Sequence, residues 1–464
     1  MTSSNFVSPS QIRAQFSAAM SAMYKDEVPL YGTLMELVAD INQNTLQADQ
    51  DLHKNLQQAK ELERLDEERH GAIRVGTPEE LHTIGRLFAV MGMHPVGYYD
   101  LTPAGVPVHS TAFRALHEDE LRVSPFRVFT SLLRLELIED AALREEARAI
   151  LANRQIFSPE ALKLIAQCEQ DGGLNADDAT RFVSEAIKTF RWHGESTVSS
   201  AQYKDLHDQH RLIADVVAFK GPHINHLTPR TLDIDSVQES MPKYGITPKA
   251  VIEGPPTRQH PILLRQTSFK ALNEPVRFSD QDTSEQGSHT ARFGEIEQRG
   301  AAVTHKGREL YDRLLNAARA ELGEAPAEHN AETYTQLMHK HFENFPDTLE
   351  QMFNNDLVYF NYLPTTQGLA KAGNYEANTS IAQLIQNGDV RLSPIVYEDF
   401  LPVSAAGIFQ SNLGDGSNSS YAQLSNQEIF ESQLGQSVID EQQLYAQTAQ
   451  RSLEQCLHAL GVQR

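Results

Sequence analysis

Thr-Ala-Phe-Arg-Ala-Leu, at residues 111–116, returns in similar form as Thr-Ser-Phe-Lys-Ala-Leu at residues 267–272. A second pair of related stretches precedes these two: Gly-Met-His-Pro at residues 92–95 and Gly-Ile-Thr-Pro at residues 245–248. Self-similarity of this kind is the signature of a duplicated structural unit. We therefore interpret the chain as containing two copies of one motif.

A histidine occupies the same place in each copy. His70 lies 43 residues before Phe113, and His226 lies 43 residues before Phe269. This agreement of residue type and spacing supports the duplication and makes the two histidines candidates for one shared site.

The first copy predicts the element order β-α-β-β-β. Residues 70–75 read as a strand, and Thr77, followed by a proline and by Glu80, is a typical helix start. Gly92 is placed to end that helix. Further strands are expected at residues 98–100, 106–113 and 126–133.

The second copy predicts the same order from residue 216 onward. We expect a first strand within residues 216–226, and a short helix that is capped by Asp235 and ended by Gly245. Three further strands are expected at residues 250–252, 262–269 and 291–298.

The predicted fold class is α+β, with tandem βαβββ modules that form a curved central sheet around a metal site. Helical additions are expected at the N-terminus, between the modules and at the C-terminus, and the charged stretch 60–69 is expected to be a solvated helix face. The predicted segments are a helical N-terminal segment (1–69), the first module (70–133), a helical insertion (134–215), the second module (216–300), and a helical and extended C-terminal region that completes the active site (301–464).

The composition excludes several classes of function. The chain has 464 residues and a net charge of −22, which disfavours nucleic acid and anionic membranes as partners. Two cysteines make no disulfide framework, and neither a signal peptide nor a long apolar run is visible. The expected location is the cytoplasm; the sequence does not specify an oligomeric state.

The candidate chemistry centres on Phe-Gly-Glu-Ile-Glu-Gln-Arg-Gly, at residues 293–300. In a strand, Glu295 and Glu297 share one face. Two histidines and one carboxylate form a ligand set that suits non-haem Fe(II) and leaves positions open on the metal. His70, His226 and one of these glutamates therefore predict a metal site. His223 and His226 are three residues apart and should point in opposite directions.

Arg74 lies on the same strand face as His70, where its guanidinium group could pair with an anionic substrate. A purely structural interpretation stays open at this point. In that interpretation the histidines are hydrogen-bonded strand residues, and the two glutamates form a solvated face that pairs with Arg292 or Arg299.

Paired modules with a histidine on each first strand and a glutamate on the last strand resemble the vicinal oxygen chelate superfamily. Residues 293–299 resemble the metal-ligand strand of 4-hydroxyphenylpyruvate dioxygenase, a resemblance that assigns the metal to Glu295 and leaves Glu297 as a neighbour.

Three longer stretches, at residues 69–74, 223–230 and 290–300, resemble the 2-oxoadipate dioxygenase/decarboxylase family, also called the 2-hydroxyglutarate synthases. The resemblance implies an Fe(II) enzyme of lysine catabolism that converts 2-oxoadipate and O2 to 2-hydroxyglutarate and CO2. It implies His70, His226 and Glu295 as metal ligands, and Arg74 as the arginine for a substrate carboxylate. The residues that it places at the substrate are His70, Arg74, His226, Val403 and Ser404.

Two alternatives remain from the sequence. One is a metal-dependent isomerase or lyase on the same scaffold, which would use another divalent ion and no O2. The other is a non-catalytic protein that binds a small anion.

Overall fold

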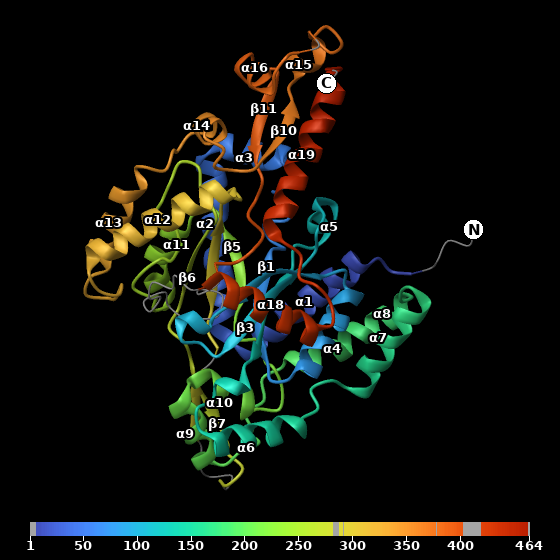
Figure 1. Ribbon diagram of the computed structural model, residues 1–464, viewed down its shortest axis with the longest axis vertical. Coiled ribbons are helices and arrows are strands. Elements are labelled where there is room, and N and C mark those ends of the chain that lie inside the picture. Colours follow the sequence, from blue (N-terminus) through green and yellow to red (C-terminus); the bar gives the residue numbers. More distant parts are fainter. Residues whose placement is uncertain (1–5, 282–286, 291, 377, 402–418, 463–464) are drawn as a thin grey trace. The chain divides into compact units, whose positions relative to one another are not determined.

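The computed structural model describes residues 6–281, 287–290, 292–376, 378–401 and 419–462 (Figure 1). The chain divides into two compact units. The first contains Met1–Lys249, Gln266–Glu297 and Phe400–Ile439, and the second contains Ala250–Arg265, Gln298–Asp399 and Asp440–Arg464. The five segments expected from the sequence divide the chain differently from these two units, and that division stays a prediction. Val403 and Ser404 lie outside the described residues.

The first module has the predicted element order. Thr77 caps the helix by accepting a hydrogen bond from the backbone N–H of Glu80, and Gly92 follows the helix with a φ of 64°, as expected. The elements are β1 (Arg69–Val75), α4 (Pro78–Val90), β2 (His94–Asp100), β3 (Val108–Arg114) and β4 (Arg127–Leu133), with α5 (Glu118–Val123) between the last two strands.

The second module departs from its predicted boundaries. The apolar run that suggested a strand within residues 216–226 belongs to the end of α10 (Arg211–Val217), so the first strand, β5 (Leu227–Thr231), begins directly after His226. The cap of α11 (Ile234–Ser240) is Asp233 rather than Asp235. No strand forms at residues 250–252, and the remaining strands are β6 (Leu264–Ser268), β7 (Asn273–Val276), β8 (Gly287–Thr290) and β9 (Glu295–Arg299).

The main sheet reveals the duplication. Its strand order is β2-β3-β4-β1-β5-β9-β6, so the two first strands lie at the centre and each is flanked by the last strand of its own module. In the first module Pro95 pairs with Phe113, and in the second an isolated bridge joins Pro248 to Phe269. These are the residues that the repeated stretches align. The predicted α+β fold with paired modules is confirmed.

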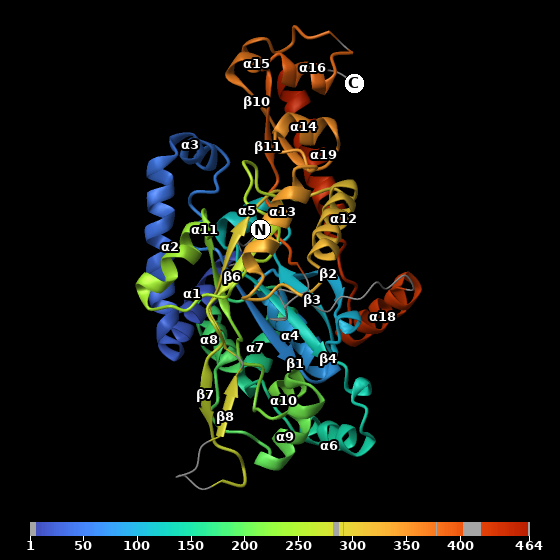
Figure 2. The same cartoon turned by 90° about the vertical axis from the view of Figure 1, so that its left-hand side faces the viewer.

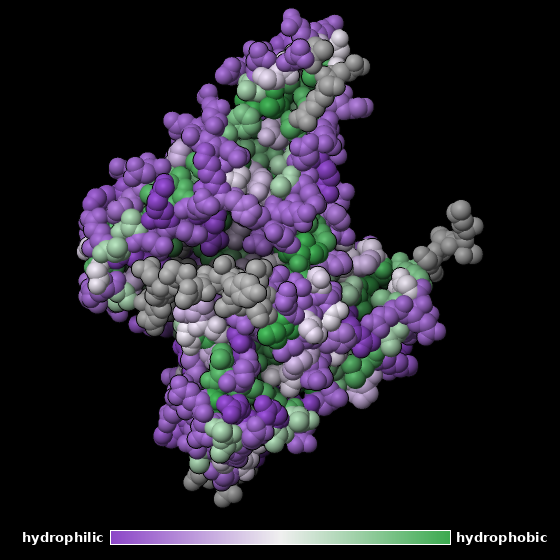
Figure 3. All heavy atoms as spheres, in the orientation of Figure 1, coloured by the Kyte–Doolittle hydropathy of each residue, from purple (hydrophilic) through white to green (hydrophobic). Residues whose placement is uncertain are grey.

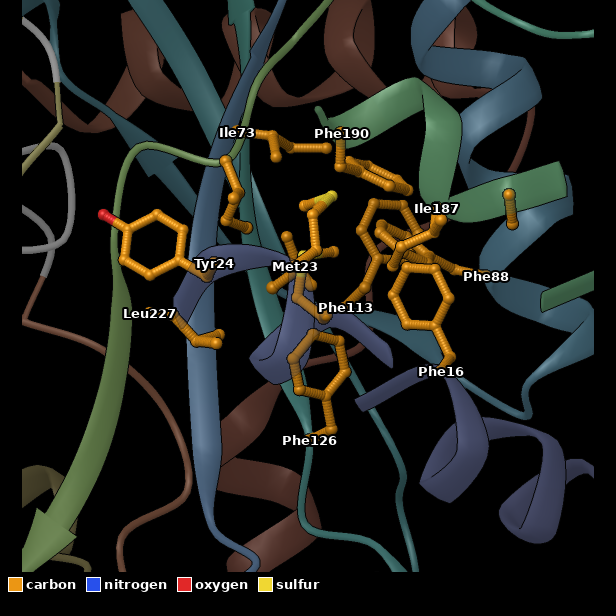
Figure 4. Packing of buried hydrophobic residues seen from close by; sticks show 14 of the residues in the cluster. Phe16, Met23, Tyr24, Ile73, Phe88, Phe113, Phe126, Ile187, Phe190 and Leu227 are labelled. Carbon is orange, nitrogen blue, oxygen red and sulfur yellow. The ribbon is translucent and has the colours of Figure 1, made fainter. Parts of the chain in front are cut away.

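Alternation along β1 separates the hydrophobic core from the site. Ile73 and Val75 point into a cluster that contains Phe16, Phe88 and Phe113 (Figure 4). Burying each such aromatic side chain stabilises the fold by about 1.5–3 kcal/mol. His70 and Arg74 alternate with Ile73 and Val75, so they lie on the opposite face of the strand.

The first unit also contains helices before the first module, between the two modules and near its C-terminal end (Figures 1 and 2). They are α1 (Pro9–Glu27), α2 (Pro29–Ala48), α3 (Gln50–Gln58), α6 (Ala141–Ala152), α7 (Pro159–Asp171), α8 (Ala176–Ala186), α9 (Ser200–Gln209), α10 and α18 (Ser419–Leu434). Short 3₁₀ turns lie at Thr102–Ala104, Leu135–Leu137, Ile187–Phe190 and Met241–Tyr244.

The second unit has its own small hydrophobic core beside an antiparallel pair of strands. This core includes Leu384, Val390, Leu457 and Leu460. The elements are α12 (His305–Leu322), α13 (Ala331–Phe342), α14 (Leu349–Asn354), β10 (Phe360–Pro364), α15 (Thr366–Ala370), α16 (Ile381–Gln386), β11 (Val390–Pro394) and α19 (Glu441–Leu460).

The charged stretch 60–69 is not a solvated helix face, and that prediction is wrong. Helix α3 ends at Gln58, and the turns that follow bury Arg64 and Glu68. Glu68 lies 3.0 Å from Arg230 at the end of β5, so these charges pair inside the first unit.

Hydrophilic residues cover most of the face drawn in Figure 3. No described helix is both long and apolar enough to cross a membrane.

Candidate metal centre

His70, His226 and Glu295 converge at the centre of the sheet. Oε1 of Glu295 lies 3.1 Å from Nε2 of His70 and 3.8 Å from Nε2 of His226. One potential ligand atom from each residue lies within 4.8 Å of the others, and all three side chains are buried. The structure therefore brings together the three residues that the sequence nominated.

The strand order explains this convergence. His70 is on β1, His226 directly precedes β5, and Glu295 begins β9, and these three strands are neighbours in the sheet. Gly294 allows the chain at the start of β9 to pack closely against Phe269, because a Cβ atom at this position would lie 2.0 Å from the ring of Phe269. The residue before Glu295 must therefore be small.

The donor atoms fit a metal ion. Both ring nitrogens of His226 are buried and have no hydrogen-bond partner among the described residues, although an unpaired buried polar atom costs about 1–3 kcal/mol. Burial lowers the pKa of His226 to about 4, so its ring is neutral and offers a lone pair. A divalent cation would use that lone pair.

The carboxylate of the set is ionised. Burial alone would raise the pKa of Glu295, but His226 and His70 hold it below its ordinary value. Thr228 and Gln266 also donate hydrogen bonds to Oε1, at 3.1 and 2.9 Å. Sequence reasoning missed both donors, although Thr228, two residues after His226, could have been found from strand alternation.

A family model described as 2-oxoadipate dioxygenase/decarboxylase matches residues 16–412. The chain belongs to this family. A 2-oxoadipate dioxygenase/decarboxylase of Pseudomonas putida is 65% identical over 462 residues, which are 100% of this chain and 99% of the relative. One of Escherichia coli is 54% identical over 454 residues, 97% of this chain and 99% of the relative.

The fold is also that of a solved family member. The crystal structure of the hydroxyglutarate synthase from Pseudomonas putida in complex with 2-oxoadipate matches with a TM-score of 0.94 and 64% identity. The match covers 99% of this chain and 100% of that chain.

Within this member of the 2-oxoadipate dioxygenase/decarboxylase family, Glu297 supports His70 from the side away from Glu295. An oxygen of Glu297 lies 3.1 Å from Nδ1 of His70, and the other lies 2.5 Å from Nη2 of Arg127. A carboxylate beside Nδ1 favours the tautomer that keeps the proton there and leaves the lone pair of Nε2 available to a metal ion. The ring of Phe400 contacts His70 at 4.9 Å between centroids and completes the surroundings of the imidazole.

Glu297→Gln is expected to weaken metal binding about tenfold to hundredfold, because a neutral amide accepts the Nδ1 proton of His70 more weakly than a carboxylate does. Anaerobic competition with a chelator measures the affinity. Glu145→Gln, at an exposed position on α6, is the matched control. Equal affinities for the two variants would contradict this role of Glu297.

The solvated-face alternative for the two glutamates is wrong. Glu295 and Glu297 are buried, whereas Arg292 pairs with Glu27 and Glu274, and Arg299 lies 3.5 Å from Glu398. These arginines therefore have other carboxylates as partners.

Arg74 lies on the site face of β1 and is nearly buried. Its Nη1 donates to Oδ2 of Asp215 at 2.6 Å, and its charge is one of the causes that lower the pKa of His226. Its role toward a substrate stays a prediction. Val403 and Ser404 also stay predictions; in sequence they follow Phe400, whose ring contacts His70.

His223 and His226 belong to different clusters, as the sequence predicted. His223 joins Asp215 and His289, two residues that the sequence analysis missed. No local signal could have found them, because α10, the loop before β5 and β8 meet only in the folded chain.

Proposed function

We propose that this chain is an Fe(II)-dependent dioxygenase that converts 2-oxoadipate and O2 to 2-hydroxyglutarate and CO2. The observation that carries the proposal is the buried set of His70, His226 and Glu295, in which the nitrogens of His226 have no partner among the described residues. The family of the chain and its 65% identity to a 2-oxoadipate dioxygenase/decarboxylase support the substrate.

Iron(II) in such a centre would supply open coordination positions for a 2-oxo acid and for O2. The ligands would be Nε2 of His70, Nε2 of His226 and a carboxylate oxygen of Glu295. The reaction balances without another reductant, because CO2 carries away the original C1 carboxylate, one oxygen atom of O2 enters the new carboxylate at the former keto carbon, and the other becomes the new hydroxyl group. The keto acid itself supplies the electrons.

Cationic side chains would receive the substrate, which carries two carboxylates. Arg74 offers a planar guanidinium group that suits a carboxylate. Lys249 also acts on this site, because its charge is among those that lower the pKa of His226 and of Glu295. These local cations offset the strongly acidic character of the whole chain.

Aromatic side chains limit the access of water to the histidines. Phe293 packs on His226 with 4.8 Å between ring centroids, and Phe400 packs on His70. Electrostatic interactions with a bound dianion are stronger in such a low-dielectric site than in water.

Purified, iron-loaded protein is expected to consume one O2 for each 2-oxoadipate and to release one CO2. An oxygen electrode, together with mass spectrometry of the product, measures this stoichiometry. Turnover without O2 consumption would favour the isomerase or lyase alternative, and tight binding of 2-oxoadipate without turnover would favour the anion-binding alternative. Either result would overturn the proposed activity.

A further inference from the structure

A second buried cluster contacts the guanidinium group of Arg74 through a carboxylate. It consists of Asp215 on α10, His223 in the loop before β5, and His289 on β8. Oδ1 of Asp215 lies 2.9 Å from Nε2 of His289 and 3.2 Å from Nε2 of His223. The other oxygen, Oδ2, accepts a hydrogen bond from Arg74 at 2.6 Å. One carboxylate therefore joins two imidazoles to the guanidinium group.

Aromatic side chains enclose the two imidazoles. The ring of Trp192 stacks on His289 at 6.0 Å with an angle of 8°, and meets His223 edge-on at 4.7 Å. The hydroxyl group of Tyr203, on α9, lies 2.7 Å from Nδ1 of His289. Helices α9 and α10 lie beside strand β7 in both ribbon views (Figures 1 and 2). The cluster is thus packed from several elements of the first unit.

The contacts of this cluster are those of a hydrogen-bonded network rather than of a second metal site. Among the described residues, no side-chain atom of Asp215, His223 or His289 is buried without a partner, whereas both ring nitrogens of His226 are. Asp215 also already faces the cation of Arg74, which would repel a divalent ion. Burial alone would raise the pKa of Asp215, but His223 and Arg74 hold it well below its usual range. The carboxylate is therefore ionised.

We propose that Asp215 is a positioning residue, which His223 and His289 fix and which in turn fixes the guanidinium group of Arg74 for the substrate carboxylate. The inference rests on the proposed function, in which Arg74 binds 2-oxoadipate. An arginine that is held in one rotamer loses less conformational entropy when it binds its ligand. Small displacements of such a group can cost about 100-fold in rate.

The test compares Asp215→Asn with the wild-type protein. Anaerobic titration of the iron-loaded protein with 2-oxoadipate gives Kd, steady-state assays give KM and kcat, and metal analysis gives the iron content. We expect Kd and KM to rise about tenfold to hundredfold, with iron content unchanged at one ion per chain. Asp208→Asn, at an exposed position on α9, is the matched control and should change none of these quantities.

Smaller changes in the network keep the test valid if Asp215→Asn does not fold. Tyr203→Phe removes only the hydroxyl group at Nδ1 of His289, and we expect Kd to rise about twofold to fivefold, in line with the loss of one modest hydrogen bond. Asp215→Glu should recover part of the affinity that Asp215→Asn loses, because it restores the charge.

A double-mutant cycle with Arg74→Lys separates positioning from independent effects. If Asp215 acts through Arg74, the two substitutions together should weaken binding by much less than the product of their single effects. The inference would be overturned if the effects of the two substitutions on Kd simply multiplied, or if Kd were unchanged in Asp215→Asn. It would also be overturned if the wild type held a second metal ion that this variant loses. A wild-type protein that neither binds nor turns over 2-oxoadipate would instead refute the proposed function.

Discussion

Glu295→Ala is expected to abolish iron binding and turnover while leaving the chain folded. The substitution removes the only carboxylate of the described ligand set and leaves His70 and His226, which are held by their own strands. Loss of an outer partner of a metal ligand typically costs about 10- to 100-fold in affinity or activity. Loss of the ligand itself should cost more.

Metal analysis after anaerobic reconstitution measures the first effect, with close to one iron per chain expected in the wild type and almost none in Glu295→Ala. Thermal unfolding gives a second measurement that does not depend on activity. Iron at about 100 times its Kd should stabilise the wild type by about 2.7 kcal/mol and should not stabilise the variant. Glu136→Ala, at an exposed position, is the control. Full iron content in Glu295→Ala would reject the ligand set.

The repeated stretches predicted the fold because they mark equivalent places in the sheet. The pairs Pro95–Phe113 and Pro248–Phe269 occupy corresponding positions on the two sides of the central strands β1 and β5. Helix capping was also readable, because the side chain of Thr77 acts on a backbone group only three residues away. Interactions between residues that are this close in the chain can be recognised from the sequence alone.

The errors come from segments whose state depends on distant contacts. The run from Val216 to Phe219 is apolar enough for a strand, but the structure uses its beginning as the end of α10. Residues 250–252 have strand-forming side chains, yet they form no strand, and the bridge of Pro248 to Phe269 just before them is isolated. Glu68 is buried because Arg230, far away in the sequence, pairs with it.

The same distinction applies to the site. His70, His226 and the pair Glu295 and Glu297 could be nominated because each lies on or beside a repeated strand, and the family resemblance then singled out Glu295. The neighbours that tune them were not predictable: Arg127 reaches Glu297 across the sheet, and Asp215 reaches Arg74 from an inserted helix. The positions of the proposed ligands thus follow from the duplication, whereas the supporting contacts join residues that are far apart in the sequence, on different modules or on the inserted helix α10.

Arg74→Ala is expected to lower kcat/KM for 2-oxoadipate about tenfold to 100-fold and to leave the iron content close to that of the wild type. A hydrogen bond to a charged group contributes about 1.5–3 kcal/mol, and every 1.4 kcal/mol corresponds to a factor of about ten. Arg74 is not one of the three proposed ligand residues, so the metal should remain. Most of the effect should therefore appear in substrate binding.

Arg74→Lys gives the informative comparison, because it keeps the charge and removes the planar fork. An intermediate loss is expected, since lysine binds a carboxylate as a point charge. Arg74→Ala also leaves Asp215 as a buried carboxylate without its cation, a change that can cost about 3–5 kcal/mol of stability. Thermal unfolding of both variants must therefore accompany the kinetics. A wild-type kcat/KM in Arg74→Ala, or a loss of iron as complete as in Glu295→Ala, would contradict a role in substrate binding and would require a different anchor for the carboxylate.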